Sequence, residues 1–282
     1  MTRRTLLAGA ALSPMAALPP MDAATPIRLV IIGDDIGAVQ AIGEGTILAY
    51  RKGIERSANL IVPGPWLLEA AGQFEDNPGL AVGIHLCLTS EWTRVKWRPF
   101  TAMPSLVDAN GYLPPSTKAV TAPTVSLFEI ERELRAQIEL GKRLVPRAAW
   151  VSAHMGAATS TPPIRELTLK LAAEYKLPLQ DTMPGVKWLR SLYTSKSTAE
   201  DKAVAMLTAI EALTPGIHVF LDHPATDTPE MRRVFHPGNE NVAEQRSGVL
   251  AAWTDTRVLA AIARRNIQLS SVADAFKTTS GA

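Results

Sequence analysis

The amino-acid sequence predicts an α/β protein built as a single-domain, irregular (β/α) barrel, and two observations lead to this prediction. Short apolar segments alternate with segments of helical periodicity from residue 27 to the end of the 282-residue chain. Repeated β-then-α units favour a parallel sheet, because a helix carries the chain back between parallel strands. About seven such units in one chain favour a barrel, closed or incomplete.

The predicted strands are short and apolar or β-branched throughout, as is typical of strands covered on both faces. They occupy 27–33, 57–63, 80–88, 148–153 and 216–222, with weaker candidates at 177–180 and 267–270. The predicted helices carry apolar residues at helical spacing and tend to end near glycine or proline. They occupy 41–52, 66–74, 127–144, 164–175, 199–213 and 242–265.

The amino-acid composition is typical of a globular protein and argues against some classes of binding partner. A hydrophobic content of 46% with 20% charged residues is ordinary for a globular protein with a sizeable core. The formal net charge of +2 and the lack of a Lys/Arg cluster argue against nucleic-acid or membrane-surface binding. The single cysteine, Cys87, excludes an intramolecular disulfide, and we expect it to be a buried, unreactive thiol. The sequence leaves a homodimer open.

Residues 1–24 are predicted to be an export signal, and 25–282 the folded domain. The paired Arg3-Arg4 is followed by a short apolar stretch, Ala8–Leu12, and then by Ala/Pro-rich sequence. This order resembles a twin-arginine signal. The apolar stretch is too short to span a bilayer, so no membrane span is expected in the mature chain. We expect an exported protein, periplasmic or secreted, and the alternative is a disordered cytoplasmic tail.

Polar residues follow three of the predicted strands. Asp34 and Asp35 come after the first strand, His85 lies near the end of the third, and His154 follows the fourth. Adjacent carboxylates at the edge of a core repel each other, so one must be protonated, paired or bound to a cation. One carboxylate and two imidazoles suit a transition-metal site with an open position, which leaves a second carboxylate for acid–base chemistry. The alternatives are a helix cap for the aspartates and core positions for the histidines.

Two further residues are candidates for the same site. His223 follows the strand at 216–222 and points toward the same mouth, where a histidine can protonate a leaving group. Arg246 lies near the start of the last long helix and is a candidate to orient an acid or bind substrate. His218 is expected in the core or at a strand edge, and His236 is expected in solvent.

The segment from Ser90 to Pro123 interrupts the β/α rhythm. It contains five prolines and several aromatic residues, and a loop of this length inside a compact domain is usually functional. It directly follows the strand that carries His85, so it should lie over the same mouth. Trp92 and Trp97 are candidates to stack on a sugar ring, and the alternative is that they pin the loop to the barrel.

Taken in order, these motifs resemble the YdjC-like family of carbohydrate deacetylases. The resemblance extends from about residue 28 to residue 276. It rests on Gly33-Asp-Asp-Ile-Gly37, the segment 43–53, Gly83-Ile-His-Leu-Cys-Leu-Thr89, Met103-Pro-Ser-Leu-Val-Asp-Ala-Asn-Gly-Tyr112, Val151-Ser-Ala-His-Met155, Asp222-His-Pro224, and Arg246 before Asp255-Thr-Arg-Val258.

The resemblance implies a polysaccharide-deacetylase-like barrel and a metal-dependent hydrolase that removes an acetyl group from an N-acetylated sugar or oligosaccharide. It implies one divalent ion held by Asp35, His85 and His154, with Asp34 as general base and His223 as acid. Zinc is the first expectation for two nitrogens and one oxygen, with magnesium or another divalent ion as the alternative.

The chain departs from the family pattern at two places. The family often has a second histidine in Ser-His-x-His, whereas His154 is followed by Met155 and Gly156. The usual aspartate before this motif is also absent. The alternative functions are a metal-dependent hydrolase of another amide, an ester or a phosphoester, and a non-catalytic sugar-binding barrel.

Overall fold

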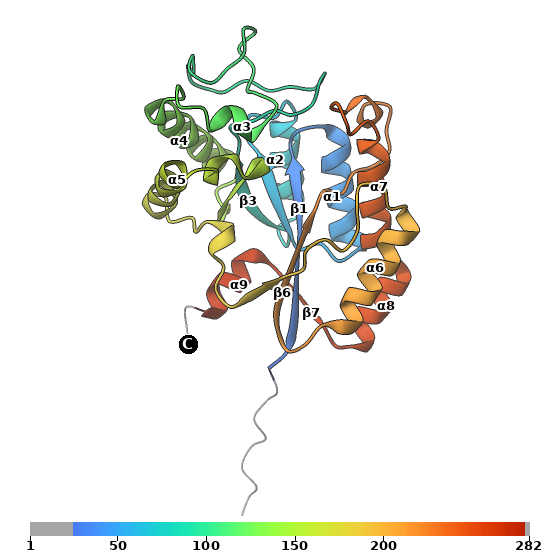
Figure 1. Ribbon diagram of the computed structural model, residues 1–282. Helices are drawn as coiled ribbons and strands as arrows, with labels where there is room; N and C mark the ends of the chain where they lie inside the picture. Colours follow the sequence, from blue (N-terminus) through green and yellow to red (C-terminus); the bar gives the residue numbers. More distant parts are fainter. Residues whose placement is uncertain (1–24, 280–282) are drawn as a thin grey trace, which may run out of the picture.

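The computed structural model describes residues 25–279, in which a parallel sheet curves into a barrel with helices outside it (Figure 1). The strand order is β4-β3-β2-β1-β6-β5, and β7 also pairs with β1. Within the described residues no ladder joins β4 to β5, so the barrel is open there. The prediction of an irregular barrel of about seven strands is confirmed. The strands are β1 (Ile27–Ile36), β2 (Ser57–Ile61), β3 (Ala81–Leu86), β4 (Val151–Ala153), β5 (Val186–Trp188), β6 (Gly216–Asp222) and β7 (Gln268–Ser270).

The helices pack around the outside of this sheet. Side chains cap four of them in the way their sequences suggest: Ser126, Thr161, Thr198 and Asp255 each accept a hydrogen bond from the first turn. The helices are α1 (Gln40–Lys52), α2 (Leu67–Asp76), α3 (Thr117–Val120), α4 (Leu127–Leu144), α5 (Pro162–Glu174), α6 (Ala199–Ala212), α7 (Val242–Trp253), α8 (Thr256–Arg264) and α9 (Val272–Thr279), with short 3₁₀ segments η1 (His154–Thr159), η2 (Gln180–Thr182) and η3 (Met231–Arg233).

Two predicted elements differ from the structure, and the structure contains α3, β5 and α9 at places where no element was predicted. The weak strand at 177–180 is wrong, because only an isolated bridge from Leu179 to Val151 forms there, and β5 pairs with β6 instead. The single helix predicted over 242–265 divides into α7 and α8, because the Asp255 side chain accepts from the Arg257 N–H and starts a new helix.

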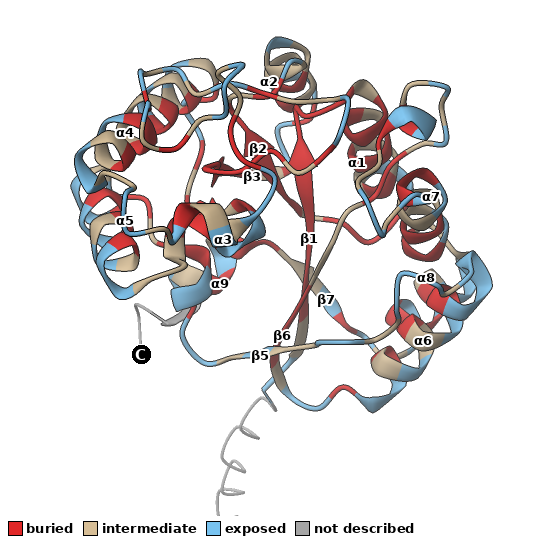
Figure 2. Cartoon of the chain, turned by 45° about the horizontal axis from the view of Figure 1, so that its top comes forward, coloured by how far each residue is buried: buried red, intermediate tan, exposed pale blue. Residues whose placement is uncertain are grey.

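Alternate residues of β1 fill two different cores, which explains its apolar sequence. Leu29 and Ile31 pack with residues of α6, α7 and α8 on one side. Val30 and Ile32 pack on the other side with Trp150 and residues of α9. Figure 2 shows β1 buried along most of its length, as expected for a central strand covered on both faces.

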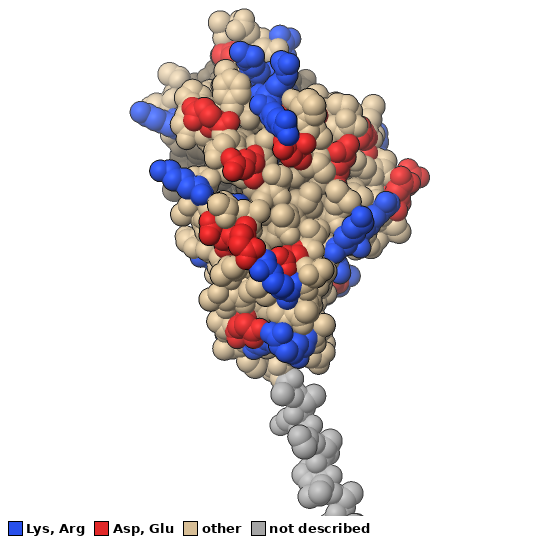
Figure 3. Space-filling view, turned by 90° about the vertical axis from the view of Figure 1, so that its right-hand side faces the viewer, with Lys and Arg blue, Asp and Glu red and all other residues tan. Residues whose placement is uncertain are grey.

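The surface charge and the hydrophobicity of the helices can be described for residues 25–279. On the face at the right of Figure 1, Lys and Arg side chains are intermixed with Asp and Glu, and no single-sign region forms (Figure 3). No helix within residues 25–279 has the length and apolar character that a membrane span requires. The expected export signal, residues 1–24, lies outside the described residues.

Candidate active site

A bulge at the end of β1 brings both aspartates to one mouth of the barrel. Successive residues of a regular strand point to opposite faces, so Asp34 and Asp35 would diverge. The pairing of β1 with β2 shifts register between Gly33 and Ile36, and Asp35 has a φ of 75°. Aspartate tolerates this left-handed conformation better than most residues, and a bulge re-aims a side chain. Neither aspartate caps α1, whose N-cap is Val39.

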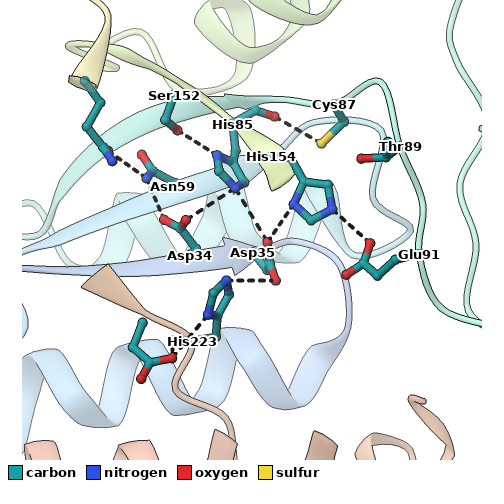
Figure 4. A network of polar contacts seen from close by, with 12 residues as sticks. Asp34, Asp35, Asn59, His85, Cys87, Thr89, Glu91, Ser152, His154 and His223 are labelled. Carbon is teal, nitrogen blue, oxygen red and sulfur yellow. Dashed lines mark hydrogen bonds and ion pairs between the residues drawn. The ribbon is translucent and has the colours of Figure 1, made fainter. Parts of the chain in front are cut away.

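Asp35, His85 and His154 converge on one point. Each offers a ligand atom, and the three atoms lie within 4.8 Å of one another. Asp35 Oδ1 is 3.6 Å from His85 Nε2 and 3.2 Å from His154 Nδ1 (Figure 4). Ligands about 2.1 Å from one ion would be roughly 3.0–3.4 Å apart, so these separations need little adjustment.

The donor atoms fit a divalent cation. Apart from their 3.2 Å approach to each other, Asp35 Oδ1 and His154 Nδ1 are buried and have no hydrogen-bond partner among the described residues. Such orphaned buried atoms are rare in native proteins and call for an explanation such as a missing ion. Burial and the nearby His154 lower the pKa of His85 to about 3, which keeps this imidazole neutral and able to bind a metal.

A further polar group orients each histidine. His85 Nδ1 is 2.7 Å from Ser152 Oγ on β4, which leaves Nε2 directed at the aspartates. His154 Nε2 is 2.9 Å from Glu91 Oε2, which leaves Nδ1 directed at Asp35. Burial opposes a charge on His154, but Glu91 and Asp35 raise its pKa to about 10, so metal binding must displace a proton here.

Asp34 lies beside the three ligand residues but makes different contacts. Asn59 on β2 donates to Asp34 Oδ1 at 2.6 Å, and the same amide donates to Gln180 at 2.8 Å. Burial, reinforced by the charge of Asp35, raises the pKa of Asp34 to about 7. A carboxyl group with a pKa near neutrality is suited to exchange a proton with a substrate or a water molecule.

Asp35, in contrast to Asp34, is held as an ionised carboxylate. Burial raises the pKa of this carboxyl, but Arg246, His223 and His154 together hold it well below its usual range. Arg246 Nη2 on α7 donates to Asp35 Oδ2 at 2.7 Å. The guanidinium therefore occupies one oxygen of Asp35 and leaves the other free for a cation. This contact places Arg246 at the site, as an orienting residue for an acid.

His223 approaches Asp35 from the end of β6. Its Nε2 is 3.7 Å from Asp35 Oδ2, and its Nδ1 is 3.3 Å from Asp222 Oδ1. Tyr193 donates its phenolic hydrogen to Asp222 Oδ2 at 2.6 Å, which fixes that carboxylate. Burial is the largest influence and lowers the pKa of His223, but the charges of Asp35 and Asp34 and the hydrogen bond with Asp222 together raise it above its usual value. His223 is therefore suited to donate a proton.

Two pockets open on different sides of these residues. A polar pocket of about 290 Å³ is lined by His223, Arg246 and Trp92, among others. Lys202 is another lining residue, and its ammonium lies 4.2 Å from the centre of the Tyr193 ring. A second pocket, of about 200 Å³, is lined by Asp34 and His85. The cluster thus has room for a ligand on both sides.

The two tryptophans of the 90–123 loop differ in their placement. Trp92 lines the polar pocket, and Arg246 lies over its ring at 5.2 Å. Trp97 is only 2% exposed, belongs to the main core cluster and lines neither pocket. Its buried ring has no face to offer a sugar, which does not fit the expected role of Trp97 in substrate binding. Its edge instead contacts His154, with ring centroids 5.7 Å apart.

Sequence reasoning missed the residues that support the cluster. Glu91 begins a loop, Asn59 lies within an apolar strand, and Asp222 directly precedes His223. Of these, Asn59 carried a usable signal, since a lone amide in a fully buried strand requires hydrogen-bond partners. The pairing of Glu91 with His154 joins residues 63 positions apart and has no local signature.

Glu91→Gln is expected to weaken divalent-metal affinity by about 10-fold to 100-fold without loss of folding. The substitution keeps the shape of the side chain but removes the charge that acts on His154, and such supporting partners are typically worth this factor. Metal titration followed by calorimetry measures the effect. Glu166→Gln, at an exposed position of α5, is the matched control and should bind metal like the parent. Equal affinity in the two variants would contradict this role of Glu91.

Comparison with known proteins identifies the family and agrees with the fold. The family model described as YdjC-like protein matches residues 28–264. A carbohydrate deacetylase of Thermus thermophilus is 30% identical over 224 residues, which cover 72% of this chain and 80% of that protein. A carbohydrate deacetylase of Geobacillus stearothermophilus is 27% identical over 89% of this chain and 99% of its own length.

Among solved structures, one from Enterococcus faecalis, described as a candidate cellobiose-phosphate cleavage protein, superimposes with a TM-score of 0.73. It is 24% identical and covers 89% of this chain and 99% of its own, so the likeness shows the fold. The family match includes β1 to β6 and every residue of the cluster from Asp34 to Arg246. The chain therefore belongs to the YdjC-like protein family.

Proposed function

We propose that this protein is a metal-dependent deacetylase that removes the acetyl group from an N-acetylated sugar or oligosaccharide. One observation supports this most strongly: a buried Asp-His-His triad has a near-neutral carboxyl on one side and a histidine suited to donate a proton on the other. Hydrolysis of an amide needs these functions, because water must lose a proton and the amine must gain one. Relatives named carbohydrate deacetylases support the substrate class.

Asp35, His85 and His154 would hold the divalent ion. When bound, it supplies polarisation of the substrate carbonyl and a lowered pKa for a water molecule. Two nitrogens and one oxygen with open positions suit zinc, with magnesium or another divalent ion as the alternative. Arg246 and Glu91 keep the ligand atoms oriented through their contacts with Asp35 and His154.

The protein side chains then move two protons. Asp34, oriented by Asn59, accepts a proton from the water molecule that attacks the carbonyl carbon. His223, held by Asp222, gives a proton to the nitrogen of the breaking C–N bond. Acetate and a free amino sugar are the products. The amine half of the substrate must therefore lie on the His223 side, in the polar pocket.

Metal analysis and acetate release together test this function. We expect about one divalent ion per chain in the purified protein, and release of acetate from N,N′-diacetylchitobiose that stops after chelation and returns when the ion is restored. His85→Ala should lose both the ion and the activity, because a three-residue site cannot spare a ligand. Full activity in metal-free protein would contradict the proposed metal dependence.

We also propose that the protein is exported through residues 1–24. The paired Arg3-Arg4 and the apolar stretch that follows support this. Mass spectrometry of protein from the source cell should find an N-terminus near Ala24. Changing both arginines to lysine should leave an intact chain in the cytoplasm. An intact Met1 on the unaltered protein would contradict export.

A further inference from the structure

We propose that the second pocket, on the Asp34 side, holds the acyl group of the substrate and accepts acyl chains longer than acetyl. This inference rests on the proposed function, because it takes Asp34 as base and His223 as acid. The pocket has a volume of about 200 Å³. We call it the acyl pocket, and its walls include Ala153, Thr159, Leu179 and Leu221.

The positions of the base and the acid determine where the two halves of the substrate bind. Asp34 lines the acyl pocket and His223 lines the polar pocket, and the two pockets share no lining residue. The leaving nitrogen must reach His223, so the sugar occupies the polar pocket. The acyl carbon chain leaves the carbonyl carbon in a different direction from the nitrogen. The space on the Asp34 side is therefore the available place for this chain.

The chemistry of the walls favours an apolar occupant. The buried polar groups of this pocket already bond to other groups of the protein: Ser152 to His85 at 2.7 Å, and Gln180 to Asn59 at 2.8 Å. Asp181 at the edge of the pocket is paired with Arg165, and Ala153, Leu179 and Leu221 add apolar surface beside the hydroxyl of Thr159. A sugar ring placed here would lose hydrogen bonds to water without replacing them, whereas an alkyl chain would gain from burial.

The polar pocket is lined by more charged and polar side chains than the acyl pocket. Its lining includes Lys202, which is buried and whose ammonium makes no ion pair within residues 25–279 and lies over the Tyr193 ring instead. It also presents His223 and Arg246. Such groups suit the hydroxyls and ring oxygen of a sugar, and the difference in polarity between the pockets matches the two halves of an N-acyl sugar.

The size of the acyl pocket exceeds what an acetyl group needs. At about 30 Å³ for each water molecule, a volume of about 200 Å³ corresponds to roughly six such molecules. Acetyl places a single methyl group beyond its carbonyl carbon. The edge at Gly156 is also open, because no heavy atom lies within 4 Å of the position a Cβ would take. Propionyl and butyryl groups therefore have room.

The test is a series of chitobiose derivatives that differ only in their N-acyl groups: acetyl, propionyl and butyryl. Release of each carboxylic acid by the metal-loaded enzyme gives kcat/KM. We expect kcat/KM to hold or to rise along the series, by up to about fourfold for each added methylene, which corresponds to about 0.8 kcal/mol per buried CH₂.

Two variants that narrow the acyl pocket from different segments of the chain test whether this pocket causes the dependence of kcat/KM on acyl length. Leu179→Phe and Thr159→Leu should each lower the butyryl-to-acetyl ratio of kcat/KM by tenfold or more. Thr194→Leu, in the polar pocket, is the matched control and should lower kcat/KM for all three substrates by the same factor. Metal content and thermal melting confirm that each variant is folded.

The outcomes separate this inference from the proposed function. If acetate is released but propionate is released at least tenfold more slowly, the inference is wrong and the deacetylase function stands. If no derivative is hydrolysed, the proposed function itself fails. If longer chains are accepted but only Thr194→Leu changes the ratio, the acyl group lies in the polar pocket and the inference is overturned.

Discussion

Replacing Asp34 with asparagine is expected to lower kcat by about 10²-fold to 10⁴-fold while the protein keeps its metal. General-base assistance is typically worth this factor, and an amide cannot accept the proton. The substitution preserves shape, and the new side chain can turn its oxygen toward the Asn59 amide, which now donates to Asp34 Oδ1 at 2.6 Å. Folding and metal content should therefore be unchanged.

Kinetics and metal analysis on the same preparation test this expectation. Asp76→Asn, at an exposed position at the end of α2, is the matched control and should behave like the parent enzyme. Wild-type kcat in Asp34→Asn would mean that another residue serves as the base, and His223 would be the next candidate. Loss of the metal would instead assign Asp34 to the ligand set.

The location of the site could be predicted from the sequence because strand direction determines it. In a parallel sheet all carboxyl ends meet at one edge, so polar residues that follow apolar runs must come together. Asp35, His85 and His154 follow this rule, and their ligand atoms converge within 4.8 Å. The helix over 127–144 was predicted for a similarly local reason, since its apolar residues recur at helical spacing.

The details that prepare the site for chemistry could not be predicted in the same way. The bulge that turns Asp35 depends on how β1 pairs with β2, and pairing between distant segments leaves no local pattern. The contact between Arg246 and Asp35 spans 211 residues, and that between Glu91 and His154 spans 63. Such contacts follow from the tertiary fold, which a single sequence does not specify residue by residue.

The packing of the aromatic residues in the loop at 90–123 also could not be predicted from the sequence. Its aromatic residues predicted either a cover for a sugar or a pin for the loop, and composition alone does not distinguish these roles. In the structure Trp92 and Trp97 pack edge to face, with ring centroids 5.6 Å apart, and both are buried. Trp92 also lines the polar pocket, although it is only 1% exposed, whereas Trp97 lines neither pocket of the site.

Trp97→Ala is accordingly expected to lower the free energy of unfolding by about 3–5 kcal/mol, which is typical when a buried aromatic side chain is removed. The ring contacts both Trp92 and His154, and its indole N–H donates to the Thr89 carbonyl at 2.9 Å. The change would leave a cavity beside a metal ligand and an unpaired buried carbonyl. Divalent-metal affinity should fall as well, because His154 loses the neighbour that fixes its ring.

Urea unfolding and metal titration measure the two effects. Trp97→Phe keeps most of the apolar contact and loses the hydrogen bond, so it should cost about 1–3 kcal/mol. Phe128→Ala is the control for an aromatic residue on the surface, 71% exposed, and should cost less than about 1 kcal/mol. If Trp97→Ala instead kept the stability and metal affinity of the parent while KM rose, the indole would act on the substrate. The loop would then open in solution far enough to expose a side chain that is buried in this structure.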